Sequence, residues 1–231
     1  MTRNALIVGA GSGISGAFAK ALAAESYSLA LAARDTGKLS GLAQETGAKT
    51  FACDVLDNDS IDTLFAETDK AFETLDVVLY NPSYRERGPL TDLDPDEVRK
   101  ALLVSAYGGF VVAQAAAKRM LAQGSGAIFF TGASASVKGY AGSAPFAMGK
   151  FALRGLAQSM ARELQPKNIH VAHFVIDGGV ANPGRGRVDS PDKPDAWLDP
   201  DAIAQSYMAI LNQPRSAWSW EIELRPWVET F

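Results

Sequence analysis

Cysteine and histidine are scarce in this sequence, and each shortage excludes a class of site. With one cysteine, Cys53, a chain of 231 residues cannot form an intrachain disulfide or a cysteine-rich zinc site. The two histidines, His170 and His173, leave few ligands for a transition metal. In a strand they would stand at i and i+3 and point to opposite faces. We therefore expect no metal site, and we interpret both histidines as structural and Cys53 as a small buried hydrophobe.

Positive charge and long apolar runs are also lacking. The formal net charge is −4 at pH 7, which gives no basic footprint for nucleic acid. No run of about 18 apolar residues is uninterrupted, so no membrane span is expected. The uncharged stretch between Arg3 and Lys20 is broken by four glycines, unlike the core of a signal peptide. The sequence thus predicts a soluble, cytoplasmic protein without nucleic-acid or membrane partners.

Hydrophobic residues make up 47% of the chain and charged residues 21%, close to ordinary globular usage. This length suits one domain that spans residues 1–231. Short apolar runs alternate with longer amphipathic ones along the chain, which is typical of a parallel sheet with helices on both faces. We therefore predict a doubly wound α/β fold of the Rossmann type, with about seven strands.

The predicted strands are nearly continuous apolar runs, as expected for strands buried on both faces. They are Asn4–Gly9, Tyr27–Ala33, Ala48–Cys53, Leu75–Tyr80, Gly126–Thr131, Ile169–Ile176 and Ala217–Leu224. The predicted helices are Ile14–Glu25, Thr36–Thr46, Asn58–Phe72, Asp94–Gln123, Ser143–Gln165 and Asp201–Asn212. Sheets of this type bind ligands beyond the carboxyl ends of their strands, where the strand order switches.

One segment, Asn182–Pro200, breaks this rhythm because it holds four of the eleven prolines and has little periodicity. Two interpretations stay open. The segment is either a surface loop or a short lid over a site, since long loops in compact domains are usually functional or disordered.

A glycine-rich turn, Val8–Gly16, lies between the first predicted strand and the first predicted helix. Such a turn lets the backbone approach a pyrophosphate, which then lies on the helix N-terminus. Two registers fit: Gly11, Gly13 and Gly16 match G-x-G-x-x-G. Gly9, Gly13 and Ser15 match a wider spacing with serine in the last place, which we prefer because Gly9 falls where the strand ends. We predict dinucleotide binding.

The residue at the end of the second predicted strand indicates which nicotinamide dinucleotide, NAD or NADP, is preferred. An acidic residue there suits the ribose 2′-hydroxyl of NAD, whereas arginine suits a 2′-phosphate. Here Ala33 stands where the acid would be, and Arg34 follows. A guanidinium and a phosphate make a bidentate, charge-assisted pair. The sequence therefore predicts NADP(H); a solvated surface arginine is the alternative.

Taken together, these motifs resemble the short-chain dehydrogenase/reductase family over essentially the whole chain. Asp54-Val55 resembles the family's adenine-contacting pair, and Asn81 resembles its conserved asparagine, although Tyr80 and Pro82 depart from that segment. Val180 stands where the resemblance implies a backbone contact to the nicotinamide carboxamide. The cofactor-binding residues so predicted are Gly9, Gly11, Ser12, Gly13, Ile14, Ser15, Arg34, Asp54, Val55, Asn81, Lys150 and Val180.

The catalytic segment departs from the family's pattern. The resemblance implies a Tyr-x-x-x-Lys pair on one helix face, where the lysine lowers the pKa of the phenol that transfers a proton. Here Phe146 replaces the tyrosine and Lys150 is present. The positions of the family's serine and helix asparagine hold Ala133 and Ser105. Losing such acid–base help typically costs about 10²–10⁴-fold in rate.

Three explanations remain open. Another hydroxyl serves, among Tyr140, Ser134, Ser136 and Ser143; Tyr140 is the sharper candidate because it is the only phenol between residues 131 and 150. Alternatively, the substrate needs no protonated oxygen, as in some C=C reductions where Lys150 or water suffices. The third is that the protein binds NADP(H) without turning it over.

The sequence thus leaves two functions. The first is an NADP(H)-dependent oxidoreductase that acts on a small carbonyl/alcohol or enone substrate, with candidate catalytic residues Lys150, Phe146, Ser134 and Tyr140. The second is a non-catalytic NADP(H)-binding sensor or scaffold subunit. By the resemblance, the apolar helices Ala101–Leu121 and Phe146–Leu164 would form the interface of a homo-oligomer, either a dimer or a tetramer.

Overall fold

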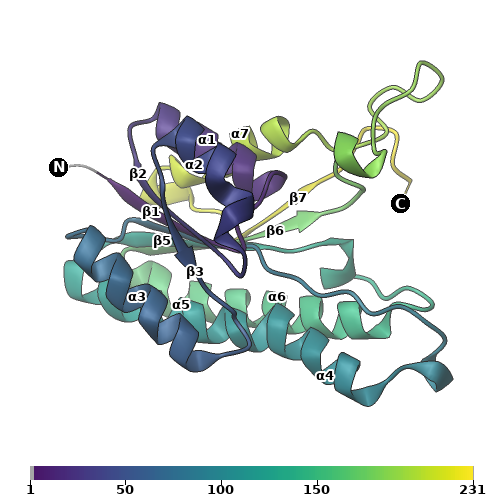
Figure 1. The fold of residues 1–231 in the computed structure, drawn as a ribbon, viewed down its shortest axis with the longest axis horizontal. Coiled ribbons are helices and arrows are strands. Elements are labelled where there is room, and N and C mark those ends of the chain that lie inside the picture. Colours follow the sequence, from purple (N-terminus) through teal and green to yellow (C-terminus); the bar gives the residue numbers. More distant parts are fainter. Residues whose placement is uncertain (1–2, 231) are drawn as a thin grey trace.

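A parallel sheet with helices on both faces forms the fold, as the computed structural model in Figure 1 shows. The structure describes residues 3–230. Every adjacent pair of strands is parallel, in the order β3-β2-β1-β4-β5-β6-β7. The strands are β1 Asn4–Val8, β2 Ser28–Ala33, β3 Lys49–Ala52, β4 Val77–Tyr80, β5 Gly126–Thr131, β6 Ile169–Ile176 and β7 Glu221–Leu224. The doubly wound fold predicted from the sequence is confirmed.

Helices cover the sheet in two layers (Figure 1). One layer contains α1 Ile14–Ala24, α2 Ser40–Thr46 and α7 Pro200–Leu211. The other contains α3 Asn58–Ala71, α4 Pro95–Leu102, α5 Gly108–Gln123 and α6 Ala144–Leu164. Three helices begin at a capping residue: Asp57, Asp94 and Asp199 cap α3, α4 and α7 by accepting a backbone N–H.

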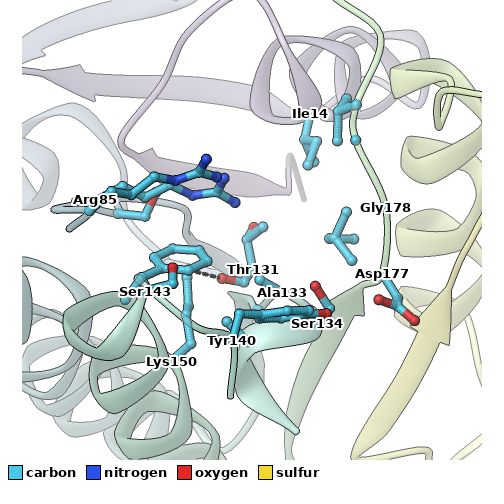
Figure 2. A pocket seen from close by; sticks show the side chains of 18 of the residues that line it. Ile14, Arg85, Thr131, Ala133, Ser134, Tyr140, Ser143, Lys150, Asp177 and Gly178 are labelled. Atoms are coloured by element: carbon cyan, nitrogen blue, oxygen red, sulfur yellow. Dashed lines mark hydrogen bonds between the residues drawn. The ribbon is translucent and has the colours of Figure 1, made fainter. Parts of the chain in front are cut away.

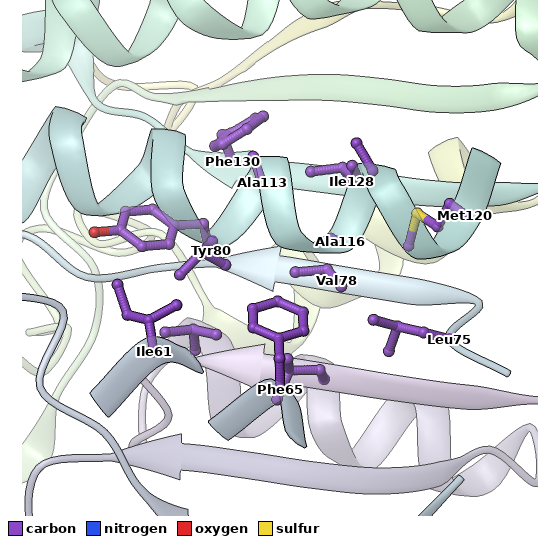
Figure 3. Packing of buried hydrophobic residues seen from close by; sticks show 14 of the residues in the cluster. Ile61, Phe65, Leu75, Val78, Tyr80, Ala113, Ala116, Met120, Ile128 and Phe130 are labelled. Atoms are coloured by element: carbon purple, nitrogen blue, oxygen red, sulfur yellow. The ribbon is translucent and has the colours of Figure 1, made fainter. Parts of the chain in front are cut away.

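The core consists of two apolar clusters, one on each face of the sheet. Alternate residues of a strand point to opposite faces, so Leu6 joins one cluster and Ile7 the other. Figure 3 shows the first, in which Ala113, Ala116 and Met120 of α5 pack over the strands. The second is rich in aromatic rings, among them Phe18, Phe129, Phe174 and Tyr207. Because both faces are covered, the strands need continuous apolar runs.

Several predicted bounds differ from the observed ones by one or two residues, and three predicted segments differ more. The predicted helix Thr36–Thr46 starts as a 3₁₀ turn, Thr36–Leu39, because the Asp35 carboxylate accepts the N–H of Gly37. The last strand is shorter than Ala217–Leu224, since Arg215–Ala217 form another 3₁₀ turn. The long helix predicted at Asp94–Gln123 is interrupted by a π-turn, Leu103–Tyr107.

The π-turn in the long helix is stabilised from the neighbouring strand. The Tyr80 hydroxyl donates a 2.5 Å hydrogen bond to the carbonyl of Val104, inside the turn. A π-turn changes the pairing of the helix carbonyls, and Tyr80 satisfies this one. Helix α6 packs closely against the turn, because a Cβ on Gly149 would lie 2.8 Å from the Ser105 Cβ. The tyrosine at position 80 therefore has a structural role here.

The helical stretch Pro95–Gln123, π-turn included, is the one described segment whose length and hydropathy would allow it to cross a membrane. Core helices pass the same test by composition. Here Val112, Ala116 and Met120 are fully buried under the sheet. The apolar character of α5 is thus accounted for by packing.

Candidate functional site

Two adjoining cavities lie at the carboxyl edge of the sheet, where the strand order switches between β1 and β4. The Arg34 cavity, about 510 Å³, lies beyond β1, β2 and β3 and is lined by Gly9–Ser12, Ala33–Asp35, Lys38 and Cys53–Leu56. The Lys150 cavity, about 910 Å³, lies beyond β5 and β6 and is lined by Thr131–Ala135, Tyr140–Ser143, Phe146, Lys150 and Ile176–Val180. Asn81 and Ser83 line both, so one elongated ligand can span the two.

The glycine turn after β1 is closed by Gly9. Its φ of +77° lies in the left-handed region, and a Cβ at this position would be 2.7 Å from the Pro82 nitrogen. The Asn81 side-chain amide donates a 3.0 Å hydrogen bond to the Gly9 carbonyl. Asn81 and Pro82, at the end of β4, therefore fix the shape of the turn.

The remainder of the turn forms an open cradle at the start of α1. Cβ atoms on Gly11 or Gly13 would meet no described atom within 4 Å, whereas one on Gly16 would lie 2.5 Å from the Gly11 carbonyl oxygen. The N-cap residue of α1 is Gly13, so no capping side chain occupies the first-turn N–H groups. This geometry fits the pyrophosphate of a dinucleotide. Both glycine registers contribute, because Gly9 and Gly16 each make a contact that forbids a side chain.

Ser15 supports the turn from inside. Its side chain is buried, and its Oγ accepts the N–H of Gly11 at 3.0 Å. The same hydroxyl lies 3.4 Å from the carbonyls of Gly9 and Gly11. The backbone of the turn therefore occupies the Ser15 hydroxyl.

The lining of the Arg34 cavity includes two cations. Arg34 and Lys38 both line the cavity, and Arg34 is exposed. The Asp35 carboxylate accepts the N–H of Gly37 and pairs with Lys38 at 3.3 Å, so these contacts occupy it. Lys38 was missed in the sequence, where only the residue at the strand end carried a signal. The pair forms a suitable pocket for a phosphate monoester.

Asp54 and Val55 line the wall of the same cavity. The Asp54 carboxylate accepts the N–H of Leu56 at 3.1 Å, which shapes the loop after β3. Cys53, beside them, is buried, and burial raises the pKa of its thiol to about 11. A thiol of that pKa is a poor nucleophile at neutral pH, so Cys53 belongs to the wall and the core.

Lys150 is the most strongly perturbed group in the Lys150 cavity. Its side chain is 2% exposed, and its Nζ donates a 2.7 Å hydrogen bond to the carbonyl of Thr131 (Figure 2). Burial, and secondarily the nearby charge of Arg85, lowers the pKa of Lys150 to about 7. At neutral pH this amine can therefore both hold and release a proton.

Phe146 occupies the helix position one turn before Lys150, on the same face. The Lys150 Nζ lies 5.9 Å from the Phe146 ring centroid, and the guanidinium of Arg85 lies 4.1 Å from it on the cavity side. The ring thus carries a cation over its face, at the position where the family has a tyrosine. Phe146 supports Arg85 and has no proton to transfer.

Of the four hydroxyl candidates named from the sequence, Tyr140, Ser134 and Ser143 line the Lys150 cavity (Figure 2). Tyr140 is 45% exposed and lies on the loop that leads into α6. Ser136 does not face the cavity: it is fully buried, accepts the N–H of Ala133 at 3.1 Å and lies 3.3 Å from His173 Nε2. The sequence alone could not tell which of Ser134 and Ser136 faces the cavity, because both lie in one short turn.

A buried polar chain fixes the loop that carries Ala133. His173 Nδ1 lies 3.1 Å from a carboxylate oxygen of Glu221, and Arg154 binds that carboxylate at 2.6 and 2.7 Å. Burial lowers the pKa of His173, so its neutral ring donates to Glu221 and accepts the Ser136 proton. Burial would raise the pKa of Glu221, but the hydrogen bonds from Arg154 and His173 lower it to about 2. This chain ties β6, β7 and α6 to the cavity floor.

His170 has its own structural partners. Its ring stacks on Trp218 with centroids 4.5 Å apart, and its Nε2 lies 2.9 Å from the carbonyl of Ser219. Within residues 3–230 no group of three or more His, Cys, Asp or Glu side chains could hold a metal ion.

The segment after β6 closes one side of the Lys150 cavity. Asp177 is buried and pairs with Lys138 at 3.3 Å and Arg225 at 2.5 Å. Gly179 packs under the Trp197 ring, where a Cβ would lie 2.3 Å from a ring carbon. Val180 lines the cavity and bridges to Leu198. Residues 182–200 contribute Arg185, Arg187 and Trp197 to its lining.

The chain is similar to several known proteins. The family model described as "short chain dehydrogenase" matches residues 3–188. A 3-oxoacyl-[acyl-carrier-protein] reductase from Mycobacterium avium is 30% identical over 180 residues, which cover 78% of this chain and 68% of that protein.

Solved structures are similar over nearly the whole chain. A short-chain dehydrogenase from Rhodopseudomonas palustris is 36% identical with a TM-score of 0.83, and covers 97% of this chain and 99% of its own. An alcohol dehydrogenase from Thermococcus sibiricus, complexed with 5-hydroxy-NADP, is 25% identical with a TM-score of 0.87, and covers 100% and 99%.

Proposed function

The chain belongs to the short-chain dehydrogenase/reductase family, and on this basis we propose that it is an NADP(H)-dependent oxidoreductase acting on a small carbonyl/alcohol or enone substrate. One observation carries the proposal. Two adjoining cavities share Asn81 and Ser83, with a phosphate-binding turn and Arg34 at one end and the buried Lys150 at the other. The alcohol dehydrogenase complexed with 5-hydroxy-NADP supports the choice of cofactor.

The cofactor, when bound, supplies or accepts the hydride. The N–H groups at the start of α1 bind its pyrophosphate, and Arg34 with Lys38 binds a 2′-phosphate. By the family pattern, Lys150 holds the nicotinamide ribose and the Val180 backbone holds the carboxamide. The Thr131 carbonyl fixes the Lys150 amine at the cavity floor. Orientation of this kind contributes to the rate separately from proton transfer.

In this proposal Tyr140 is the proton donor. In the reducing direction, hydride adds to the carbonyl carbon and the Tyr140 hydroxyl gives its proton to the carbonyl oxygen. Tyr140 is the one phenol among the cavity-lining residues, and a phenol is a stronger acid than the serine hydroxyls of Ser134 and Ser143. Solvent then returns a proton to the Tyr140 oxygen, because the ring is partly exposed.

The proposed function is tested by mixing the protein with NADPH and a panel of carbonyl and enone compounds and following cofactor absorbance. Binding of NADPH followed by oxidation with at least one compound is expected. Absence of binding to NADPH and NADH alike would reject the proposal.

Arg34→Ala is expected to weaken NADPH binding by about tenfold to a hundredfold while leaving NADH binding within about twofold. The reason is the loss of a charge-assisted hydrogen-bonded contact to a group that only NADPH carries. Fluorescence titration of both cofactors measures the change. Arg162→Gln, an exposed arginine at the far end of α6, is the matched control. Tighter binding of NADH than of NADPH by the unmodified protein would contradict the cofactor choice.

A non-catalytic NADP(H)-binding role is the second candidate. The observation that favours it is Phe146, which leaves the family's proton-donor position without a hydroxyl and carries Arg85 on its ring. NADPH binding with no turnover across the panel would favour this candidate over the first.

We also propose a homo-oligomer built on α5 and α6. Tyr107 and Phe110 are 46% and 43% exposed, their ring centroids are 6.3 Å apart, and they line an apolar groove with Leu156. Phe110→Asp is expected to convert a dimer or tetramer into monomers, because a buried unpaired charge opposes association. Light scattering after gel filtration measures the mass. Val188→Asp, at an exposed valine, is the control; a monomeric unmodified protein would refute the interface.

The single-domain organisation, the lid over residues 182–200 and the cytoplasmic location remain proposals. The lid is supported by the position of Arg185, Arg187 and Trp197, which line the Lys150 cavity.

A further inference from the structure

Four arginines line the Lys150 cavity and come from two loops far apart in the sequence. Arg85 and Arg87 follow β4, and Arg185 and Arg187 follow β6. Both loops leave the carboxyl edge of the sheet, so the fold brings two Arg-x-Arg pairs to the same cavity. The chain as a whole is acidic, with a net charge of −4, which makes this local concentration of positive charge a property of the site.

These guanidinium groups have no anionic partners in the part of the chain that the structure describes. Within residues 3–230 no side chain forms an ion pair or hydrogen bond with any of the four. Two carboxylates also line the cavity: Asp177 is already paired with Lys138 and Arg225, and Glu229 is exposed. The four guanidinium groups therefore lie outside every ion pair of the described residues.

Aromatic rings hold two of the four arginines in place. The guanidinium carbon of Arg85 lies 4.1 Å from the Phe146 ring centroid, and that of Arg187 lies 5.8 Å from the Trp197 ring centroid. Stacking orients a guanidinium without using its hydrogen-bond donors, which stay free for a ligand. Figure 2 shows Arg85 on one side of the cavity lining and Tyr140 and Ser134 on another.

The arginines also repel one another. Burial lowers the pKa of Arg85, and the like charges of Arg87 and Arg187 lower it further. Like charges gathered around a shared space destabilise the empty site, and a bound anion would relieve that repulsion.

We propose that the Lys150 cavity binds a substrate carrying an oxyanion, a carboxylate or a phosphate ester, which Arg85 and Arg187 hold while the carbonyl lies near Tyr140. This inference rests on the proposed function for the identity of the reacting group. Guanidinium forks match both oxyanions in a bidentate manner. The proposal also accounts for Phe146, because the ring at the family's tyrosine position stacks on an anion-binding arginine.

Calorimetric titration tests the proposal with benzoate, benzamide and phenyl phosphate, each with and without NADPH. Benzoate and benzamide have nearly the same shape and differ in charge. We expect benzoate or phenyl phosphate to bind at least tenfold more tightly than benzamide, and the stronger of the two identifies the oxyanion. In an Arg85→Gln/Arg187→Gln variant this preference is expected to fall by about tenfold or more, because charge-assisted contacts are lost. Arg162→Gln should keep it.

Three results would overturn the proposal: equal binding of all three probes, no binding of any, or an unchanged preference in the double variant. Loss of NADPH affinity in the double variant would also overturn it, because the arginines would then serve the cofactor. NADPH binding by the unmodified protein is measured separately, so failure of the cofactor assignment is distinguished from failure of the anion site. Circular dichroism melting confirms that the variants fold.

Discussion

Tyr140→Phe is expected to lower the turnover number by about 10²–10⁴-fold, the usual contribution of a positioned general acid. NADPH binding should stay within about twofold, because the change removes one exposed hydroxyl and leaves the ring. The comparison uses steady-state rates with the best substrate of the carbonyl and enone panel. A fall in the turnover number without loss of cofactor affinity is the signature of a missing proton donor.

Two further variants make this result specific to Tyr140. Ser134→Ala removes a hydroxyl from the same cavity and should lower the rate by less than about tenfold. Phe146→Tyr restores the family's phenol beside Lys150, yet it should add little activity, since Arg85 covers that ring. Unchanged turnover in Tyr140→Phe rejects the assignment, and a large gain in Phe146→Tyr would point to an enzyme that has lost its donor.

Lys150→Met is expected to abolish turnover and, at the same time, to make the fold more stable at neutral pH. The folded-state pKa of Lys150 is about 7, whereas an unfolded lysine has a pKa of about 10.4. A difference of this size means that the charged, buried amine lowers the free energy of unfolding by roughly 4 kcal/mol below pH 7. The lost hydrogen bond to Thr131 offsets part of the gain, so a net stabilisation of about 1–3 kcal/mol is expected.

The pH dependence of this effect follows from the direction of the shift. Between pH 7 and about 10.4 the unfolded chain binds the Lys150 proton more tightly than the folded protein does. The contribution of Lys150 to stability therefore becomes less unfavourable as the pH rises through this window. The melting temperature of Lys150→Met should exceed that of the unmodified protein by the largest amount at and below pH 7. Near pH 10 the lost hydrogen bond to Thr131 should leave the variant no more stable than the unmodified protein.

Melting curves from pH 6 to pH 10 measure that difference. Lys118→Met, at an exposed lysine on α5, is the matched control and should show a small difference that does not change with pH. A constant melting-temperature difference across the range for Lys150→Met would mean that the buried amine does not titrate near neutrality.

Sequence reasoning succeeded where the signal is local. Apolar runs and amphipathic periods gave the alternation of strands and helices, because these patterns arise within ten or twenty neighbouring residues. The glycine turn was recognisable for the same reason. Gly9 adopts a positive φ, and a side chain on Gly16 would collide with the Gly11 carbonyl oxygen. The π-turn at Leu103–Tyr107 was missed because its stabilising contact comes from Tyr80, more than twenty residues away.

For this protein, then, the sequence alone determined the doubly wound sheet, the family and the glycine-rich turn, because each depends on the spacing of neighbouring residues. Tertiary structure decided the chemistry of the Lys150 cavity. Burial sets the pKa of Lys150, and the meeting of two loops about a hundred residues apart places Arg85 beside Arg187. Charge, exposure and the direction of a side chain depend on neighbours that only the folded chain supplies.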